Sequence, residues 1–153
     1  MAIVDKPTDY FNTKLYTGNG STNAITGVGF QPDWLWLKKR NSSANHFLFD
    51  AVRGASKELN SNNSEAEASP ANYLSSFDSD GFTIGSDSDI NGSSDTFVSW
   101  NWKAGTSVSG NTGGSGTSKS YSGSVNTDAG FSIIKYTGNG TAGHTIPHHL
   151  GVQ

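Results

Sequence analysis

Short apolar runs alternate with polar turns along the whole chain, and no long segment has the spacing of an amphipathic helix. Residues 12–17 predict a first strand, and Gly18-Asn19-Gly20 predicts a hairpin turn after it. A second strand over 25–30 is interrupted by Gly27 and Gly29, which indicates a bulge or a loop.

The apolar run Trp34-Leu35-Trp36-Leu37 puts large side chains on both faces, as expected for a central strand buried on two sides. A polar turn over 41–45 follows it. Residues 46–50 then predict a strand in which Phe47 and Phe49 share one face, because side chains alternate along a strand.

The rest of the first hundred residues also reads as short elements. They are a helical turn or short strand over 51–60, a polar loop over 61–69, strands over 73–77 and 82–85 around a turn at 78–81, a polar loop over 86–94, and a strand over 96–102 with Val98, Trp100 and Trp102 on one face. Six to eight short strands predict an antiparallel β-sandwich or barrel over 1–103.

A repeat divides the chain. The pentapeptide Tyr16-Thr17-Gly18-Asn19-Gly20 recurs as Tyr136-Thr137-Gly138-Asn139-Gly140, 120 residues later. Gln31 and Gln153 close the matching segments, with a period two residues longer. Repeats of this length are domain-sized modules. We therefore expect an incomplete second module over 119–153, of which 119–126 predicts a strand or an extended arm, and a chain that stops inside that module.

Residues 104–118 separate the two units. Twelve of these fifteen residues are Gly, Ser or Thr, and none is aromatic. This composition predicts a flexible linker. An isolated two-stranded piece is marginally stable, so the second unit is expected to lie on the first unit, to pair with another chain, or to remain loose.

Composition narrows the class of protein. Hydrophobic residues make up 33% and charged residues 15%, but aromatic residues reach 11%, which argues against disorder. A net charge of −3 argues against nucleic acid as a partner, and the one basic cluster, Lys38-Lys39-Arg40, fits a solvated strand end. The chain has no cysteine, no apolar signal region in its first twenty residues and no apolar run long enough to span a membrane.

Candidate ligand-binding groups are few. Trp34, Trp36, Trp100 and Trp102 form two pairs spaced by two residues, and exposed indole faces stack on sugar rings. We expect one tryptophan of each pair in the core and the other, Trp36 or Trp102, near a surface or an interface.

Acidic and histidine clusters are weaker candidates. Asp78 and Asp80 lead a run with Asp87, Asp89 and Asp95 that has the oxygen ligands of a Ca²⁺ site, although Asx turns are favoured. His144, His148 and His149 are candidate ligands of a transition metal, and an exposed loop is favoured instead.

Catalytic signatures are sparse. Glu65 and Glu67 form the one close glutamate pair, in a predicted loop, and glycosidases need two carboxyl groups facing each other across a cleft. Asp50 and Arg53 predict a local ion pair with a structural role. We therefore expect a protein that is not an enzyme and that needs no cofactor.

Several longer motifs together resemble a module common in structural proteins of marine bacteriophages and cyanophages. The likeness covers nearly all of 1–103 and resumes at Gly130-Phe131. The motifs are Tyr10-Phe11-Asn12-Thr13, Ile25-Thr26-Gly27-Val28-Gly29-Phe30-Gln31-Pro32-Asp33-Trp34, Phe49-Asp50 with Val52-Arg53-Gly54, Ser76-Phe77-Asp78-Ser79-Asp80-Gly81-Phe82, and Val98-Ser99-Trp100-Asn101-Trp102-Lys103-Ala104-Gly105.

This resemblance implies a tandem, lectin-like jelly-roll module in a tail-fibre, appendage or capsid-surface protein. It implies a virion location after assembly in the host cytoplasm, with other virion proteins, self-association and host-surface carbohydrate as partners. The charge and the lack of a long apolar run indicate neither nucleic acid nor membrane as a partner. Two alternatives remain open: an architectural decoration or assembly protein without a ligand, and a polysaccharide depolymerase.

Overall fold

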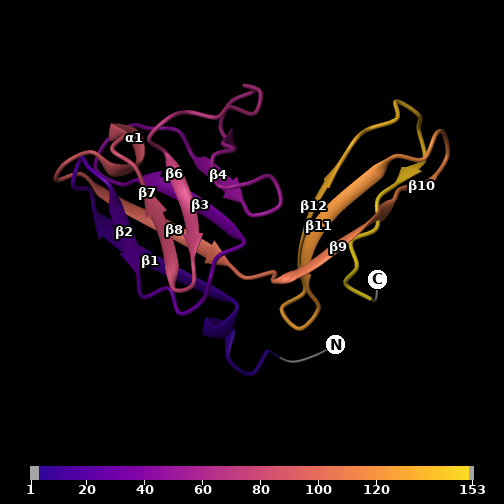
Figure 1. Ribbon diagram of the computed structural model, residues 1–153, viewed down its shortest axis with the longest axis horizontal. Helices are drawn as coiled ribbons and strands as arrows, with labels where there is room; N and C mark the ends of the chain where they lie inside the picture. The colour runs from indigo at the N-terminus through magenta and orange to yellow at the C-terminus, as the bar shows by residue number, and fades with distance from the viewer. Residues whose placement is uncertain (1–3, 152–153) are drawn as a thin grey trace.

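A computed structural model describes residues 4–151 and shows an all-β protein with two β units side by side (Figure 1). All the strand pairings are antiparallel. The elements are η1 (Pro7–Asp9), β1 (Phe11–Thr17), β2 (Asn23–Thr26), β3 (Trp34–Lys39), β4 (Phe47–Asp50), β5 (Leu59–Asn60), β6 (Leu74–Asp78), β7 (Gly81–Ile84), α1 (Ser88–Asn91), β8 (Thr96–Trp102), β9 (Thr106–Asn111), β10 (Gly113–Gly114), β11 (Ser120–Asn126), β12 (Phe131–Tyr136) and β13 (His144–Thr145).

The first unit holds two sheets with the hydrophobic core between them. The larger sheet has the order β1-β8-β3-β4-β5, and the smaller one has the order β2-β7-β6. Burial of apolar surface between the sheets is the main force that holds this unit together. The core residues are Ile25, Leu35, Leu37, Phe47, Phe49, Leu74, Phe82, Ile84 and Ile90.

Strand β3 is central, as its sequence predicts, because it lies between β8 and β4. Leu35 and Leu37 are fully buried on the core face, opposite the half-buried Trp34 and Trp36 on the outer face. The prediction that Phe47 and Phe49 share a buried face is also confirmed. The expectation of one core tryptophan in each pair is wrong, because residues two apart in a strand point to the same face.

In strand β8 the hydrophobicity of the side chains does not indicate which face is buried. Val98, Trp100 and Trp102 share one face, as predicted, and this is the outer face, while Phe97, Ser99 and Asn101 face inward. Ser99 and Asn101 are fully buried despite being polar. The Asn101 amide donates to the Ser99 hydroxyl at 3.0 Å and to the Asn12 carbonyl at 2.9 Å, which offsets the cost of burying its NH2 group, whereas its Oδ1 has no partner among the described residues.

The predicted hairpin at 18–20 is wrong. Strands β1 and β2 belong to different sheets, so the turn carries the chain from one sheet to the other. Gly20 has a positive φ of 68°, and Asn19 accepts a hydrogen bond from the Ser21 amide. Turn residues specify a local bend, whereas the strands that pair are decided by which faces can be buried.

The neighbouring loops are better defined than their polar sequences suggest. The predicted break after the second strand is confirmed, since Gly27 and Gly29 have positive φ angles. Residues 51–60 resolve into turns followed by the short strand β5. The predicted loop over 86–94 contains α1, where the Asp87 side chain accepts from the Asp89 amide as an N-cap.

The prediction of a flexible linker over 104–118 is wrong for most of its length. Strand β9 pairs with β11, and β11 pairs with β12, which gives a three-stranded sheet of order β12-β11-β9. Short polar residues can form a ladder because the backbone supplies its hydrogen bonds. Burial comes from Tyr121 and Val125 on β11, the segment for which a strand was one of two alternatives.

The two units touch through aromatic and backbone contacts. The Phe131 ring stacks on Trp102 and meets Trp34 edge to face, each at 6.1 Å between ring centroids. The Asp33 carboxylate accepts from the Ala104 amide at 2.8 Å, and the Gly105 amide donates to the Ser124 hydroxyl. In the part of the chain that the structure describes, no helix has the length and apolar character needed to cross a membrane.

Candidate functional site

An aromatic face lies on the outside of the five-stranded sheet. Trp34 is opposite Trp102 across β3 and β8, and Trp36 is opposite Trp100. The Trp36 and Trp100 rings lie 5.7 Å apart between centroids and meet edge to face, which is one of the arrangements that aromatic pairs prefer. All four indoles are half-buried, so they combine a fixed position with an exposed apolar surface.

The predicted candidate Trp36 is held by a specific hydrogen bond. Its indole Nε1 donates to His46 Nδ1 at 3.1 Å. Because an indole N–H can only donate, His46 Nδ1 must be the unprotonated nitrogen of a neutral ring. The histidine therefore helps to fix the Trp36 ring, which it also meets edge to face at 5.7 Å between centroids.

The other predicted candidate, Trp102, has an internal role. Phe11 lies 4.8 Å from its ring centroid, and Phe131 of the second unit stacks on it. Trp102 therefore packs the two units together. Trp102 also lines a groove with Phe11 and Phe131, and Trp34 lines another one. The sequence did not single out Trp34, because both tryptophan pairs have the same spacing of two residues.

A groove of about 350 Å³ runs beside the aromatic face, between the five-stranded sheet and β12. Trp34, Leu48 and Leu59 form its apolar wall, and residues 132–136 form the opposite wall. Asp50 and Arg53 add charge, with Arg53 Nε 2.5 Å from Asp50 Oδ2, which confirms the predicted ion pair.

A second groove, of about 540 Å³, lies over β9 and β11 of the second unit and has a mixed polar and apolar lining. Gln31 and Asp33 line it from the first unit, and burial raises the pKa of Asp33 above its ordinary value. The second unit contributes hydroxyl groups from alternate positions of two strands, namely Ser107, Ser109, Ser122 and Ser124. Serines spaced by two residues put their hydroxyl groups on one face of a strand. This spacing was the sequence signal that could have identified strand β9 and the serine wall of the groove.

Asp78 and Asp80 lie away from the tryptophans, in the turn between β6 and β7. Asp78 accepts from the hydroxyls of Ser76 and Thr83, at 2.7 and 2.6 Å. Asp80 accepts from the amides of Gly29 at 2.6 Å and Gly27 at 3.0 Å. The structure therefore does not bring the four predicted ligand-binding residues together. Asp78 links strands β6 and β7, and Asp80 ties the loop at Gly27 and Gly29 to the turn between these strands.

Asp80 makes stability depend on pH. Hydrogen bonds from the amides of Gly29 and Gly27 hold its pKa below the ordinary value. Its contribution is therefore present above the unfolded pKa of about 3.9 and is lost as the pH falls through the lower folded pKa. We expect wild-type protein to have a higher urea midpoint than Asp80→Asn at pH 6, and the two midpoints to converge in acid.

The matched control for this measurement is Asp128→Asn, because the Asp128 carboxylate has no hydrogen-bond partner within residues 4–151. This variant should follow the wild-type midpoint across the titration. A constant difference between Asp80→Asn and wild type from pH 6 to about pH 2 would contradict the proposed linkage.

The histidines of the second unit have separate partners. His144 Nε2 lies 2.6 Å from the Thr112 hydroxyl, and His149 Nε2 lies 2.8 Å from the Tyr121 hydroxyl. His148 Nδ1 accepts from the Leu150 amide. Among residues 4–151, no three His, Cys, Asp or Glu side chains are grouped so that they could hold a metal ion.

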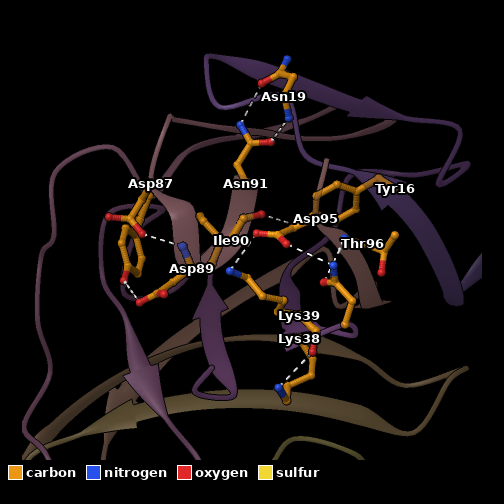
Figure 2. A network of polar contacts seen from close by, with 12 residues as sticks. Tyr16, Asn19, Lys38, Lys39, Asp87, Asp89, Ile90, Asn91, Asp95 and Thr96 are labelled. Carbon is orange, nitrogen blue, oxygen red and sulfur yellow. Dashed lines mark hydrogen bonds and ion pairs between the residues drawn. The ribbon is translucent and has the colours of Figure 1, made fainter. Parts of the chain in front are cut away.

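A buried polar network surrounds α1 (Figure 2). The fully buried Asn91 accepts from the Asn19 amide at 3.1 Å, and its own amide donates to the Gly85 carbonyl at 2.7 Å. Tyr16 donates to the Ile90 carbonyl, and burial raises the pKa of Tyr16. This network joins the first copy of the repeated pentapeptide to α1, and nothing in the sequence marks Asn91 as its centre.

Charged groups complete the same region. Lys39 Nζ lies 3.0 Å from Asp95 Oδ2, and this contact, with a hydrogen bond from Asn41, holds the pKa of Asp95 below its usual value. Lys39 is therefore buried and paired, so the predicted solvated strand end is wrong at this position. The network positions the start of β8, which carries Trp100 and Trp102.

Residues 6–153 match a family described as a domain of unknown function (DUF7483), and the chain belongs to this family. Neither the curated proteins nor the solved structures gave a significant match to the chain.

Proposed function

We propose that this protein is a non-enzymatic structural module of a bacteriophage virion that adheres to host-surface glycans. In this proposal the first unit is a lectin-like jelly-roll sandwich in a tail fibre, an appendage or the capsid surface, and it is assembled in the host cytoplasm with other virion proteins. The outer aromatic face is the observation that carries the adhesion role. The motif resemblance supports the virion role.

The chemistry of the face suits carbohydrate. A half-buried indole offers a flat apolar surface for the C–H face of a sugar ring, and its position is fixed before binding, so little entropy is lost. Trp34, Trp36 and Trp100 supply such surfaces. Asp50 and Arg53 line the adjoining groove, but they pair with each other, and Arg53 also donates to Glu67 and to the Leu48 carbonyl. The adhesion role therefore rests on the tryptophans.

A depolymerase is less well supported by the geometry around the candidate carboxylates. Glu67 lies 3.3 Å from Arg53 Nη1 and 3.9 Å from Lys57 Nζ. The Glu65 carboxylate accepts from the Asn63 side-chain amide, and the Glu65 backbone amide donates to Asn63 Oδ1. These contacts support structural roles for both glutamates, and we propose no catalytic residue.

The adhesion role is tested with the full chain on a glycan array and on host-range panels of bacterial cells. We expect Trp36→Ala to weaken binding about fivefold, because one aromatic contact contributes about 1 kcal/mol. Leu15→Ser is the control, since Leu15 is 57% exposed on the same sheet but lies outside both grooves. A blank array together with blank cell binding would reject the adhesion role.

A purely architectural role is favoured by one separate observation, the unpaired edge of β12. Among the strands of residues 4–151, β12 pairs with β11 alone and stands at the edge of its sheet. An unpaired edge offers backbone donors and acceptors to another chain. If this edge serves assembly, deleting residues 119–153 should abolish self-association, and unchanged oligomerisation by light scattering would reject the role.

A further inference from the structure

Strand β12 is the second copy of β1. Phe11 corresponds to Phe131 and Tyr16 to Tyr136, and each strand runs into the same pentapeptide. The turns also match, because the Ser21 amide donates to Asn19 and the Thr141 amide donates to Asn139. The partners of the two strands nevertheless differ, since β1 pairs with β8 and β12 pairs with β11.

The hydrogen bonds at the ends of β1 show which of its edges faces β8. The Tyr10 carbonyl accepts from the Lys103 amide, and the Gly18 amide donates to the Asp95 carbonyl. Backbone groups of successive residues point to opposite edges of a strand. The even-numbered residues Asn12, Lys14 and Tyr16 therefore point their backbone groups at β8, and the odd-numbered residues of β1 point to its free edge.

The same reasoning gives the opposite result for β12. The Thr112 amide donates to the Lys119 carbonyl, so the odd-numbered residues of β11 face β9 and the even-numbered ones face β12. Register then pairs Ser124 with Ile133 and Ser122 with Lys135. The backbone groups of Ser132, Ile134 and Tyr136 must therefore point to the open edge of β12.

The two edges are equivalent residue by residue. Ser132, Ile134 and Tyr136 are the counterparts of Asn12, Lys14 and Tyr16 at an offset of 120 residues. Strand β12 thus keeps open the edge with which β1 binds β8, and it binds β11 through the edge that β1 leaves free. The three-stranded sheet of the second unit occupies none of the backbone groups that a β8-like strand would need.

The side-chain contacts of the two copies differ in the same way as their backbone pairing: they are made in the first copy and open in the second. Tyr16 stacks on Phe97 of β8 at 5.1 Å, whereas its counterpart Tyr136 is 52% exposed. Gly18 is buried, and a Cβ there would lie 2.2 Å from the Gly92 carbonyl oxygen, whereas a Cβ at Gly138 would meet nothing within 4 Å. The surface that holds residues 90–102 in the first copy is therefore exposed in the second.

Part of the equivalent surface is already in use. The Asn139 amide donates to the carbonyls of Ser115 and Thr117, both at 3.0 Å, where Asn19 of the first copy meets Asn91. The loop at 115–117 thus supports the turn of the second copy. The β12 edge and Gly138 remain free, and Tyr136 meets only the His144 ring among the aromatic rings of the described residues, edge to face at 6.3 Å between centroids. Residues 132–136 line the groove of about 350 Å³.

We propose that the open edge of β12 binds a segment equivalent to residues 90–102 from a second copy of this module. The incoming β8-like strand pairs antiparallel with β12 through Ser132, Ile134 and Tyr136, and its phenylalanine stacks on Tyr136. Sheet β9-β11-β12 then continues into the five-stranded sheet of the next module. This strand addition does not depend on glycan binding, although the incoming strand would narrow the groove beside Trp34.

The test uses the full chain extended after Gln153 by a second copy of residues 32–105, which continues the repeat in phase. Amide hydrogen exchange is measured in the extended and the original chain. We expect the amides of Ser132, Ile134 and Tyr136 to exchange at least about tenfold more slowly in the extended chain. Ile133 and Lys135, which already bind β11, should change little.

Two serine-to-proline variants provide a matched pair at the two edges of the same sheet. Ser132→Pro removes a donor from the open edge of β12 and should abolish the added protection of Ile134 and Tyr136. Ser109→Pro removes a donor that points away from β11 at the β9 edge and should leave that protection intact. Equal loss of protection in both variants would contradict docking at β12.

A third variant tests whether the docked segment packs against Gly138. Gly138→Ala should be silent in the original chain and should lower the urea midpoint of the extended chain, because a second Gly92 carbonyl would then approach residue 138 as the first approaches Gly18. The inference is overturned if the appended segment folds while Ser132, Ile134 and Tyr136 exchange at their original rates. It is also overturned if the appended segment stays unfolded.

Discussion

Replacing Gly18 by alanine is expected to lower the free energy of unfolding by about 3 kcal/mol, the upper end of the usual cost of overpacking. A Cβ at this position would lie 2.2 Å from the Gly92 carbonyl oxygen and 2.7 Å from the Asn91 carbonyl carbon. Both are backbone atoms, so relief requires the turn or the end of α1 to move. That movement would weaken the contacts of α1 with β1 as well.

The repeat supplies the control for this prediction. Gly138→Ala introduces the same methyl group at the equivalent position, where nothing lies within 4 Å. We expect it to change the free energy of unfolding by less than about 0.5 kcal/mol, as surface substitutions usually do. Urea unfolding followed by tryptophan fluorescence measures both variants. Equal destabilisation by the two substitutions would show that loss of glycine flexibility, and not close packing, explains the effect.

Replacing Asn91 by alanine is expected to cost about 3 kcal/mol, because each buried polar group left without a partner costs about 1–3 kcal/mol. Asn91 is fully buried, and its side chain serves groups from three segments. Its Oδ1 accepts from the Asn19 amide and from the Asn23 side chain, both at 3.1 Å. Its amide donates to the Gly85 carbonyl, which would lose this partner in the variant.

Asn139→Ala is the matched substitution in the second copy. Asn139 is only half-buried, and the carbonyls of Ser115 and Thr117 that it serves are exposed. Water can replace the lost hydrogen bonds there, so we expect a loss of no more than about 1 kcal/mol. Thermal unfolding of the two variants at equal concentration tests this difference. A larger loss for Asn139→Ala than for Asn91→Ala would contradict the assigned role of burial.

The prediction of strands succeeded where the apolar pattern was strong. The aromatic and leucine run at 34–37 and the alternation at 96–102 both correspond to strands of the larger sheet. It failed for 104–118, where strand β9 is made of small polar residues. Amino-acid composition indicates how much apolar surface a segment can bury. Strand β9 is held mainly by backbone hydrogen bonds to β11, which composition does not reveal.

The candidate site was predicted only in part. Trp36 does lie on an exposed aromatic face, but Trp102 is covered by Phe11 and Phe131, and the second of these comes from the other unit. Asp78 and Asp80 hold turns on the smaller sheet. Sequence spacing reports which residues of one strand share a face, and it contains no information on which other strand will cover that face.

The sequence by itself determined the strand-rich class of this protein, the position of its central strand and the repeat that relates β1 to β12, because these depend on local periodicity and identity. Only the tertiary structure decided that serine and asparagine of β8 face the core while its tryptophans face outward. It alone also decided which edge of β12 stays open. Both depend on pairing between segments far apart in the chain, where long-range burial outweighs local preference.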